Sequence, residues 1–119
     1  MRALWILALL AIVGGALHVR GAPKAAPLHP DDPRTTTGKN GVVLLAAEWC
    51  GYCRKLQDDF SRAGVRHRVL DIDTPQGARA LRAVGAPGVP VTIVGQHVIR
   101  GYDPAALDKT LVPLGYRVY

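Results

Sequence analysis

Two cysteines at a predicted strand-to-helix junction constrain this chain more than any other feature. They are Cys50 and Cys53, the only cysteines among 119 residues, and two residues separate them. The continuous apolar run Val42–Ala46 before them is typical of a buried strand. Residues 54–63 after them carry helical spacing, and Gly64 is placed to end that helix. We therefore predict that the pair lies where a buried strand passes into the N-terminus of a helix.

This position favours reactive thiols. Unpaired backbone N–H groups and the macrodipole at a helix N-terminus stabilise negative charge, which lowers the pKa of a thiol placed there. The thiolate of Cys50 is then able to attack a disulfide sulfur, and Cys53 is close enough to displace the product. We predict that Cys50 is the nucleophile and Cys53 the resolving thiol; the alternative is a buried or chance pair without chemistry.

The cysteine count argues against two other kinds of site. A structural disulfide framework spreads several pairs along the chain so that they close long loops. A zinc site needs two further ligands, and the sequence has neither a second cysteine pair nor two closely spaced histidines. We therefore assign no metal ligands.

The remaining pattern alternates between strands and helices. A second strand is expected at residues 65–73, and Thr74-Pro75 opens a second helix that Gly85 ends. A hairpin follows, with strands at 91–94 and 97–100 joined by Gly95-Gln96, and Asp103-Pro104 begins a last helix through residue 111. The predicted order is β-α-β-α-β-β-α.

The first forty residues differ from the rest. Residues 3–17 contain no charge, so we read residues 1–19 as a signal peptide or signal anchor, the alternative being an apolar core helix. The basic Arg2 favours a cytoplasmic N-terminus and an exported domain, periplasmic or anchored in the inner membrane facing the periplasm. Residues 20–40 hold four prolines and are expected to form a flexible linker before a domain at 41–114.

Charge does not suggest a nucleic-acid partner. The net charge is +6, but from Gly41 onward 10 Lys and Arg oppose 7 Asp and Glu, which leaves +3. No run of Lys or Arg resembles a nucleic-acid-binding surface, and the few aromatic residues are not interleaved with basic ones. We expect contact with a membrane only through the N-terminal segment.

A second motif, Gly88-Val89-Pro90-Val91, comes directly before the hairpin. Proline cannot donate to a sheet ladder, so Pro90 belongs at the start of a strand. A cis Val89–Pro90 bond would expose the backbone of Val89 to an extended substrate. The local sequence leaves open whether the bond is cis or the residue is an ordinary loop proline.

Together these motifs resemble the glutaredoxin branch of the thioredoxin fold. The resemblance covers about residues 42–111 and rests on Trp-Cys-Gly-Tyr-Cys between strand and helix, Gly-Val-Pro-Val before the hairpin, and Arg-Gly-Tyr-Asp after it. It implies an α/β, thioredoxin-like three-layer sandwich with a four-stranded mixed sheet.

The resemblance also implies a glutathione site. In that family the proline matching Pro90 is cis, and the backbone of the residue matching Val89 pairs with glutathione. The family's Gly-Gly-x-Asp motif helps to hold the glutathione carboxylates, and its last three positions are matched here. The predicted glutathione-binding residues are Tyr52, Val89, Pro90, Gly101, Tyr102 and Asp103.

Three positions depart from the family pattern. Gly51 replaces the proline of the usual Cys-Pro-Tyr-Cys, and the greater flexibility of glycine would change the potential of the disulfide. Arg100 replaces the first glycine of Gly-Gly-x-Asp, and Ala47 stands where a lysine often precedes the active site. Trp49 beside the first cysteine is instead typical of thioredoxins.

The predicted function is that of a glutathione-linked thiol–disulfide oxidoreductase. It would act as a monomer on protein disulfides and glutathione mixed disulfides, with glutathione as co-substrate and no tightly bound cofactor. The alternative is an iron–sulfur or copper-binding module that uses the same cysteines. Two cysteines cannot complete a four-thiolate site, so that alternative requires a second subunit or glutathione.

Overall fold

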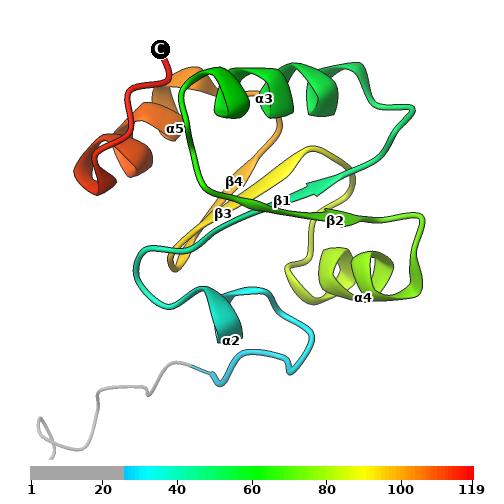
Figure 1. Ribbon diagram of the computed structural model, residues 1–119. Coiled ribbons are helices and arrows are strands. Elements are labelled where there is room, and N and C mark those ends of the chain that lie inside the picture. Colours follow the sequence, from blue (N-terminus) through cyan, green and yellow to red (C-terminus); the bar gives the residue numbers. More distant parts are fainter. Residues whose placement is uncertain (1–25) are drawn as a thin grey trace, which may run out of the picture.

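The computed structural model describes residues 26–119 (Figure 1). The predicted signal segment, residues 1–19, and the first part of the predicted linker lie outside the described residues. Between residues 26 and 119, no helix has the length and apolar character needed to span a bilayer.

The centre of the molecule is a four-stranded sheet in the order β2-β1-β3-β4. Strand β1 (Val42–Ala46) pairs in parallel with β2 (Arg68–Asp71) and antiparallel with β3 (Val91–Val94). Strand β4 (His97–Arg100) completes the hairpin with β3. The sheet is therefore mixed, with the strand that precedes the cysteines buried in the middle, as the continuous apolar run predicts.

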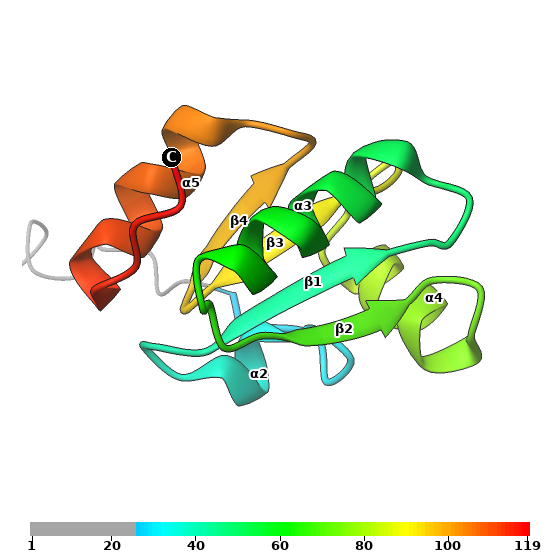
Figure 2. The same cartoon turned by 45° about the horizontal axis from the view of Figure 1, so that its top comes forward.

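Helices cover both faces of the sheet (Figures 1 and 2). Helices α3 (Gly51–Arg62) and α5 (Pro104–Leu111) lie on one face, and α4 (Pro75–Ala83) lies on the other. The predicted thioredoxin-like three-layer fold and its element order are confirmed.

Alternate residues of β1 pack on opposite faces of the sheet, because successive side chains of a strand point to opposite sides. Leu44 lies in a buried cluster with Leu56 and Phe60 of α3 and residues of α5. Leu45 lies in a second cluster on the other face, which includes Ala80 of α4. The two clusters hold the three layers together.

Strand β2 is shorter than predicted. The expected strand covered residues 65–73, whereas the observed one begins at Arg68. The backbone N–H of Val65 donates to the carbonyl of Phe60 at 2.9 Å, and Gly64 has a φ of 69°. This is the hydrogen bond that closes a helix with a left-handed glycine, so Val65 belongs to the end of α3.

Part of the expected flexible linker is folded onto the domain. Helix α2 (Arg34–Thr37) packs beside the β3–β4 turn, where the hydroxyl of Thr37 donates to the carbonyl of Gly95 at 2.6 Å. The side-chain amide of Gln96 donates to the carbonyls of Arg34 and Gly38, each at 3.0 Å. Long-range hydrogen bonds therefore join residues 34–38 to the hairpin, and the short segment around them, residues 32–40, is called the docked segment.

The buried carboxylate of Asp32 starts this docked segment. It accepts a hydrogen bond from the backbone N–H of Arg34 at 2.9 Å and pairs with the Arg34 guanidinium at 2.7 Å. Burial alone would raise the pKa of Asp32, but these bonds outweigh it and lower the pKa below its ordinary value. A charged Asp32 thus closes the turn that leads into α2.

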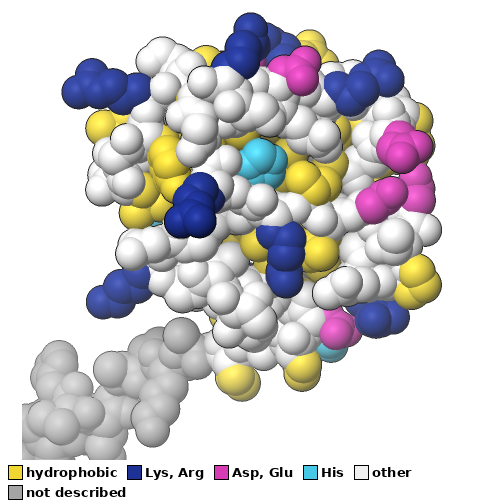
Figure 3. Space-filling view, in the orientation of Figure 1, with side chains coloured by type: hydrophobic (Ala, Val, Ile, Leu, Met, Phe, Trp, Pro, Cys, Tyr) yellow, Lys and Arg dark blue, Asp and Glu magenta, His cyan; other side chains and the backbone are white. Residues whose placement is uncertain are grey.

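The chain after α5 also packs on the domain. A short 3-10 helix, η1 (Val112–Leu114), follows α5, and Tyr116 and Val118 then pack against the cluster on the α3 face. Residues after the predicted domain end at 114 therefore also pack on the α3 face. On the face shown in Figure 3, Lys and Arg side chains are dispersed among other residues and form no continuous basic patch.

Candidate active site

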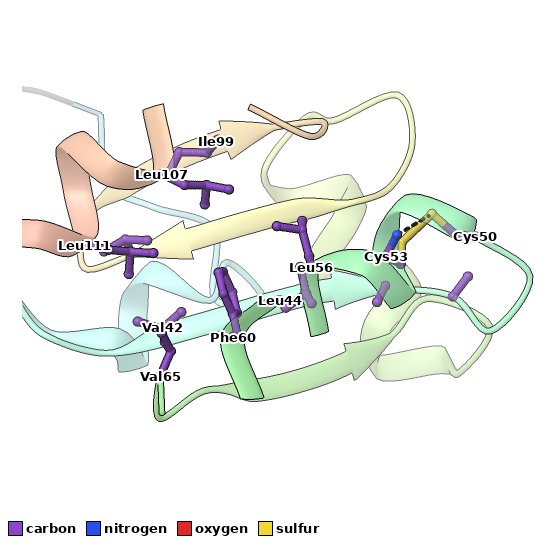
Figure 4. Close-up of a cluster of buried hydrophobic side chains, with 13 residues drawn as sticks. Val42, Leu44, Cys50, Cys53, Leu56, Phe60, Val65, Ile99, Leu107 and Leu111 are labelled. Carbon is purple, nitrogen blue, oxygen red and sulfur yellow. Dashed lines mark hydrogen bonds between the residues drawn. A yellow bond between two sulfur atoms is a disulfide. The ribbon is translucent and has the colours of Figure 1, made fainter. Parts of the chain in front are cut away.

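The two cysteines meet at the N-terminus of α3 as a disulfide (Figure 4). Cys50 is the N-cap residue of the helix, with extended backbone angles, and its sulfur accepts a hydrogen bond from the backbone N–H of Cys53 at 3.2 Å. The exposed fraction is 8% for Cys50 and 0% for Cys53. Cys50 is therefore the more exposed of the two cysteines, and its role as nucleophile stays a prediction.

The surroundings of Cys50 favour negative charge on its sulfur once the disulfide is opened. The N–H of Cys53 already points at that sulfur, and the first turn of α3 contains no acidic residue. A helix N-terminus and such a donor both stabilise a thiolate. Glu48 is the nearest acid in sequence; it is exposed, and its backbone carbonyl accepts from Arg54 at 3.4 Å.

The Val89–Pro90 peptide bond is cis. The cis isomer, one of the two alternatives that the local sequence left open, is thus the one present. The carbonyl of Pro90 accepts a hydrogen bond from the N–H of Gly101 at 2.9 Å, which joins two of the predicted motifs. Val89 is half-buried and packs against the cluster that contains both cysteines.

Two more predicted residues form an aromatic pair. The ring of Tyr52, with an exposed fraction of 63%, stacks on the ring of Tyr102 with 5.5 Å between centroids and 23° between planes. The ammonium of Lys55 lies 5.4 Å from the centroid of the Tyr102 ring, a cation–π arrangement. Tyr52 therefore forms, with Tyr102 behind it, an aromatic wall beside the cysteines.

The remaining predicted residue, Asp103, caps a helix. Its carboxylate accepts a hydrogen bond from the N–H of Ala106 at 3.1 Å and starts α5. It remains exposed, so the cap leaves part of the carboxylate in solvent.

Arg100 points away from the cysteines. Its guanidinium donates to the carbonyl of Val84 at 3.1 Å, at the end of α4. Val98, two residues earlier on the strand, packs in the cluster on the α4 face, so both side chains lie on that side of the sheet.

A cavity of about 560 Å³ lies on the other side of the active-site loop, between α3 and the ends of β1 and β2. Ala47, Glu48, Arg54 and Asp71 are among the residues that line it. None of the predicted glutathione-binding residues lines this cavity. The active-site loop is therefore flanked by two different surfaces, the aromatic wall and this cavity.

Trp49 is held in place by a contact that the sequence did not suggest. The indole N–H donates to the carboxylate of Asp73 at 3.0 Å, while the ring stays exposed. Thr74, predicted to open the second helix, is its N-cap and accepts from the N–H of Gly77 at 3.1 Å.

Asp59 is a further residue that the sequence did not single out. It is buried on α3, and its carboxylate accepts hydrogen bonds from the hydroxyls of Tyr119 at 2.8 Å and Tyr102 at 3.3 Å. Burial would raise the pKa of Asp59, but the bonds from Tyr119 and Arg62 and the charge of Lys55 outweigh it and lower the pKa. An Asp three residues before an Arg on a helix is typical of a surface ion pair, so nothing in the local sequence distinguished Asp59 from an exposed acid.

Metal-ligating side chains do not gather in the described part of the chain. Among residues 26–119 no group of three or more His, Cys, Asp or Glu side chains is placed to hold a metal ion.

Comparison with known proteins shows which family the chain resembles. Residues 42–99 match the family model described as Glutaredoxin, whereas no curated protein matches the chain significantly. The structure resembles a buckwheat glutaredoxin–glutathione complex at 26% identity, with a TM-score of 0.56 and coverage of 68% of this chain and 81% of the other.

Two further solved structures are similar. The glutaredoxin-like protein NrdH-redoxin from Escherichia coli shares 25% identity, with a TM-score of 0.52 and coverage of 57% of this chain and 91% of the other. The glutaredoxin from Archaeoglobus fulgidus is 19% identical, with a TM-score of 0.55 and coverage of 73% and 98%, and this likeness concerns the fold. The chain therefore has the α/β, thioredoxin-like fold of its glutaredoxin structural neighbours, and its residues 42–99 resemble the glutaredoxin family.

Proposed function

We propose that this protein exchanges thiols and disulfides, and that it reduces glutathione mixed disulfides of proteins with glutathione as co-substrate. The observation that carries the proposal is the Cys50–Cys53 disulfide at the start of α3, in which the more exposed sulfur accepts the N–H of Cys53. A family domain with such a cysteine pair supports thiol–disulfide oxidoreductase activity in general.

The reaction begins with the reduced protein. The thiolate of Cys50 attacks the glutathione sulfur of a mixed disulfide, a Cys50–glutathione bond forms, and the client leaves as a thiolate that takes up a proton. The thiol of Cys53 loses its proton and attacks the sulfur of Cys50, which releases glutathione and forms the Cys50–Cys53 disulfide. Two molecules of glutathione then reduce this disulfide and leave as glutathione disulfide.

Two features support glutathione as the co-substrate. Val89 packs against the cluster that contains the cysteines, and Tyr52 with Tyr102 provides an exposed aromatic wall. The buckwheat glutaredoxin, one of the similar structures, is a complex with glutathione. Ala47 in place of a lysine removes one cation, so we expect glutathione to bind more weakly than it does to a site with that lysine.

We further propose that residues 1–19 direct the domain out of the cytoplasm, where it acts on client proteins as a monomer. The uncharged residues 3–17 after a basic start support this proposal. An exported reductase needs a supply of reductant, since an oxidising compartment otherwise keeps such a disulfide closed.

The test is reduction of a glutathionylated peptide, coupled to glutathione and glutathione reductase, by the purified protein and by Cys50→Ser and Cys53→Ser. We expect activity in the unchanged protein, none in Cys50→Ser, and partial activity in Cys53→Ser, because glutathione itself can release the mixed disulfide on Cys50. If the unchanged protein reduces an insulin disulfide with dithiothreitol but is inactive with glutathione, the glutathione part of the proposal is wrong. Inactivity with both substrates would refute disulfide exchange.

A further inference from the structure

The carboxylate of Asp59 joins three segments that are distant in sequence. One of its oxygens accepts from both Tyr102, 43 residues away, and Tyr119, 60 residues away. Arg62 donates to the other oxygen at 2.7 Å, and Lys55 lies 3.8 Å from it. With an exposed fraction of 7%, the carboxylate makes these bonds largely out of water, where each bond is stronger than on the surface.

This cluster is continuous with the aromatic wall. Tyr102 uses its hydroxyl to reach Asp59 and its ring face to stack on Tyr52, which lies between the two cysteines in sequence. The ring of Tyr119 meets the ring of Tyr102 edge to face at 6.2 Å and 88°. Each contact restrains Tyr102, and Tyr102 is the support behind Tyr52.

We propose that Asp59 is a positioning residue for the aromatic wall: it fixes the ring of Tyr102, and through it Tyr52, in the orientation that receives the substrate. Tyr119, which contacts both Asp59 and the Tyr102 ring, adds to this restraint. The inference rests on the proposed function. By this inference, the segment after η1 contributes to substrate binding, although it lies beyond the family match at residues 42–99.

A purely structural role for Asp59 would have a different signature. If the carboxylate only stabilised the fold, its loss would lower the melting temperature without changing substrate affinity in the folded protein. If it positions the wall, substrate affinity should fall at temperatures where the protein remains folded, and the effect should pass through Tyr102. A double-mutant cycle measures that dependence.

The experiment compares Asp59→Ala, Tyr102→Phe, the double variant and Tyr119→Phe, with Tyr116→Phe as matched control. Tyr116 is a half-buried tyrosine of the same segment whose hydroxyl makes no hydrogen bond within residues 26–119. With the glutathionylated peptide, we expect KM to rise about threefold to tenfold in both single variants at positions 59 and 102, the change that one lost hydrogen bond gives. The KM of the double variant should not exceed that of Asp59→Ala. The kcat of each variant should stay within about twofold of that of the unchanged protein. Tyr116→Phe should have the same KM as the unchanged protein.

A second readout does not depend on activity. In the oxidised protein, nuclear Overhauser contacts between the rings of Tyr52 and Tyr102 should weaken in Asp59→Ala and persist in Tyr116→Phe. Loss of these contacts in Asp59→Ala would support the positioning role whether or not the protein is active. Inactivity of the unchanged protein with every disulfide substrate would refute the proposed function, but not the positioning role. Ring contacts that persist in a folded Asp59→Ala, additive effects in the double variant, or an equal rise of KM in Tyr116→Phe would overturn the inference.

Discussion

Gly51 occupies the first position of α3, directly after the N-cap Cys50. A proline fits this position, because the N–H at the first helical position has no partner within the helix. Cys50 has a φ of −90° and a ψ of 111°, which is the extended conformation that a residue before proline adopts, and a Cβ at Gly51 would meet no atom within 4 Å. The structure thus accommodates the proline that is usual in this family.

We therefore expect Gly51→Pro to raise the free energy of unfolding by about 0.5–1 kcal/mol, since the unfolded chain loses more freedom than the folded one. Urea unfolding of the oxidised protein measures the change. Gly88→Pro serves as a comparison outside the helix. A destabilised Gly51→Pro would show that the backbone around Cys50 is not free to accept the ring.

The lowered pKa of Asp59 predicts a pH dependence of stability. The ordinary pKa is 3.8, and Tyr119, Tyr102, Arg62 and Lys55 hold the folded value below it. The contribution of Asp59 to stability is thus fully present above the unfolded pKa and is lost as pH falls through the folded pKa.

We expect the gap in unfolding free energy between the unchanged protein and Asp59→Asn to be widest near neutral pH and to narrow below about pH 4. Urea unfolding at a series of pH values from 7 downward measures this gap. Asp58→Asn, one residue earlier on the exposed surface of α3, is the control and should show little change. A gap that stayed constant with pH would mean that Asp59 acts without its charge.

At the scale of elements, the approach of α4 to β2 depends on one glycine. Gly77 is buried in the first turn of α4, and a Cβ added there would lie 1.8 Å from the carbonyl oxygen of Asp71. Because the obstacle is backbone, the helix as a whole must move away from the strand. This close approach explains why α4 tolerates a residue that otherwise weakens helices.

Gly77→Ala should therefore lower the free energy of unfolding by about 2 kcal/mol or more, through overpacking, even though alanine is the better helix former. Thermal unfolding should show a melting temperature lower by roughly 8 °C or more. Gly51→Ala, a helical glycine with open space around it, should show no such loss. Equal melting temperatures for the two variants would contradict the tight contact.

At the scale of the whole molecule, the docked segment 32–40 enlarges the cooperative unit. Thr37 is buried, and its hydroxyl bond to Gly95 spans 58 residues; nearby, the N–H of Gly95 donates to the carbonyl of Gly41 at 2.8 Å. We expect Thr37→Val to cost about 1–2 kcal/mol, since the carbonyl of Gly95 is left without its donor. Unfolding should remain a single transition.

Hydrogen exchange checks this expectation residue by residue. The amide of Gly95 should exchange faster in Thr37→Val than in Thr36→Val, whose hydroxyl bonds only to the carbonyl of Pro33 in its own turn. If the amide of Gly95 exchanged at the same rate in both variants and in the unchanged protein, segment 32–40 would not contribute to the stability of the domain.

The sequence predicted those features that depend on local order. The strand before Cys50, the helix after Cys53 and the hairpin each follow from periodicity and turn residues within a dozen positions, and all three are confirmed. The boundary at Val65 was wrong because a glycine-closed helix end and a strand start share the same apolar residues. The glutathione-binding roles inferred from the family resemblance remain predictions.

What the sequence could not predict depends on contacts between distant segments. Asp59 resembles a surface acid of a helix, and Thr37 a polar residue of a proline-rich stretch, until the fold brings Tyr119 and Gly95 to them. Their partners lie 58 to 60 residues away, and no local pattern encodes such a pairing. The residues missed are therefore those whose importance is tertiary.

The position of the docked segment also determines which end of the molecule lies away from the N-terminal attachment point. It sits on the hairpin turn, where β1 begins, whereas the cysteines follow the opposite end of β1, about 17 Å away for a strand of five residues. A tether, a tag or a solid support joined to the N-terminal side thus holds the protein by the pole opposite its disulfide. The reactive end stays turned outward and open to large clients, so immobilised protein should keep its access to bulky substrates.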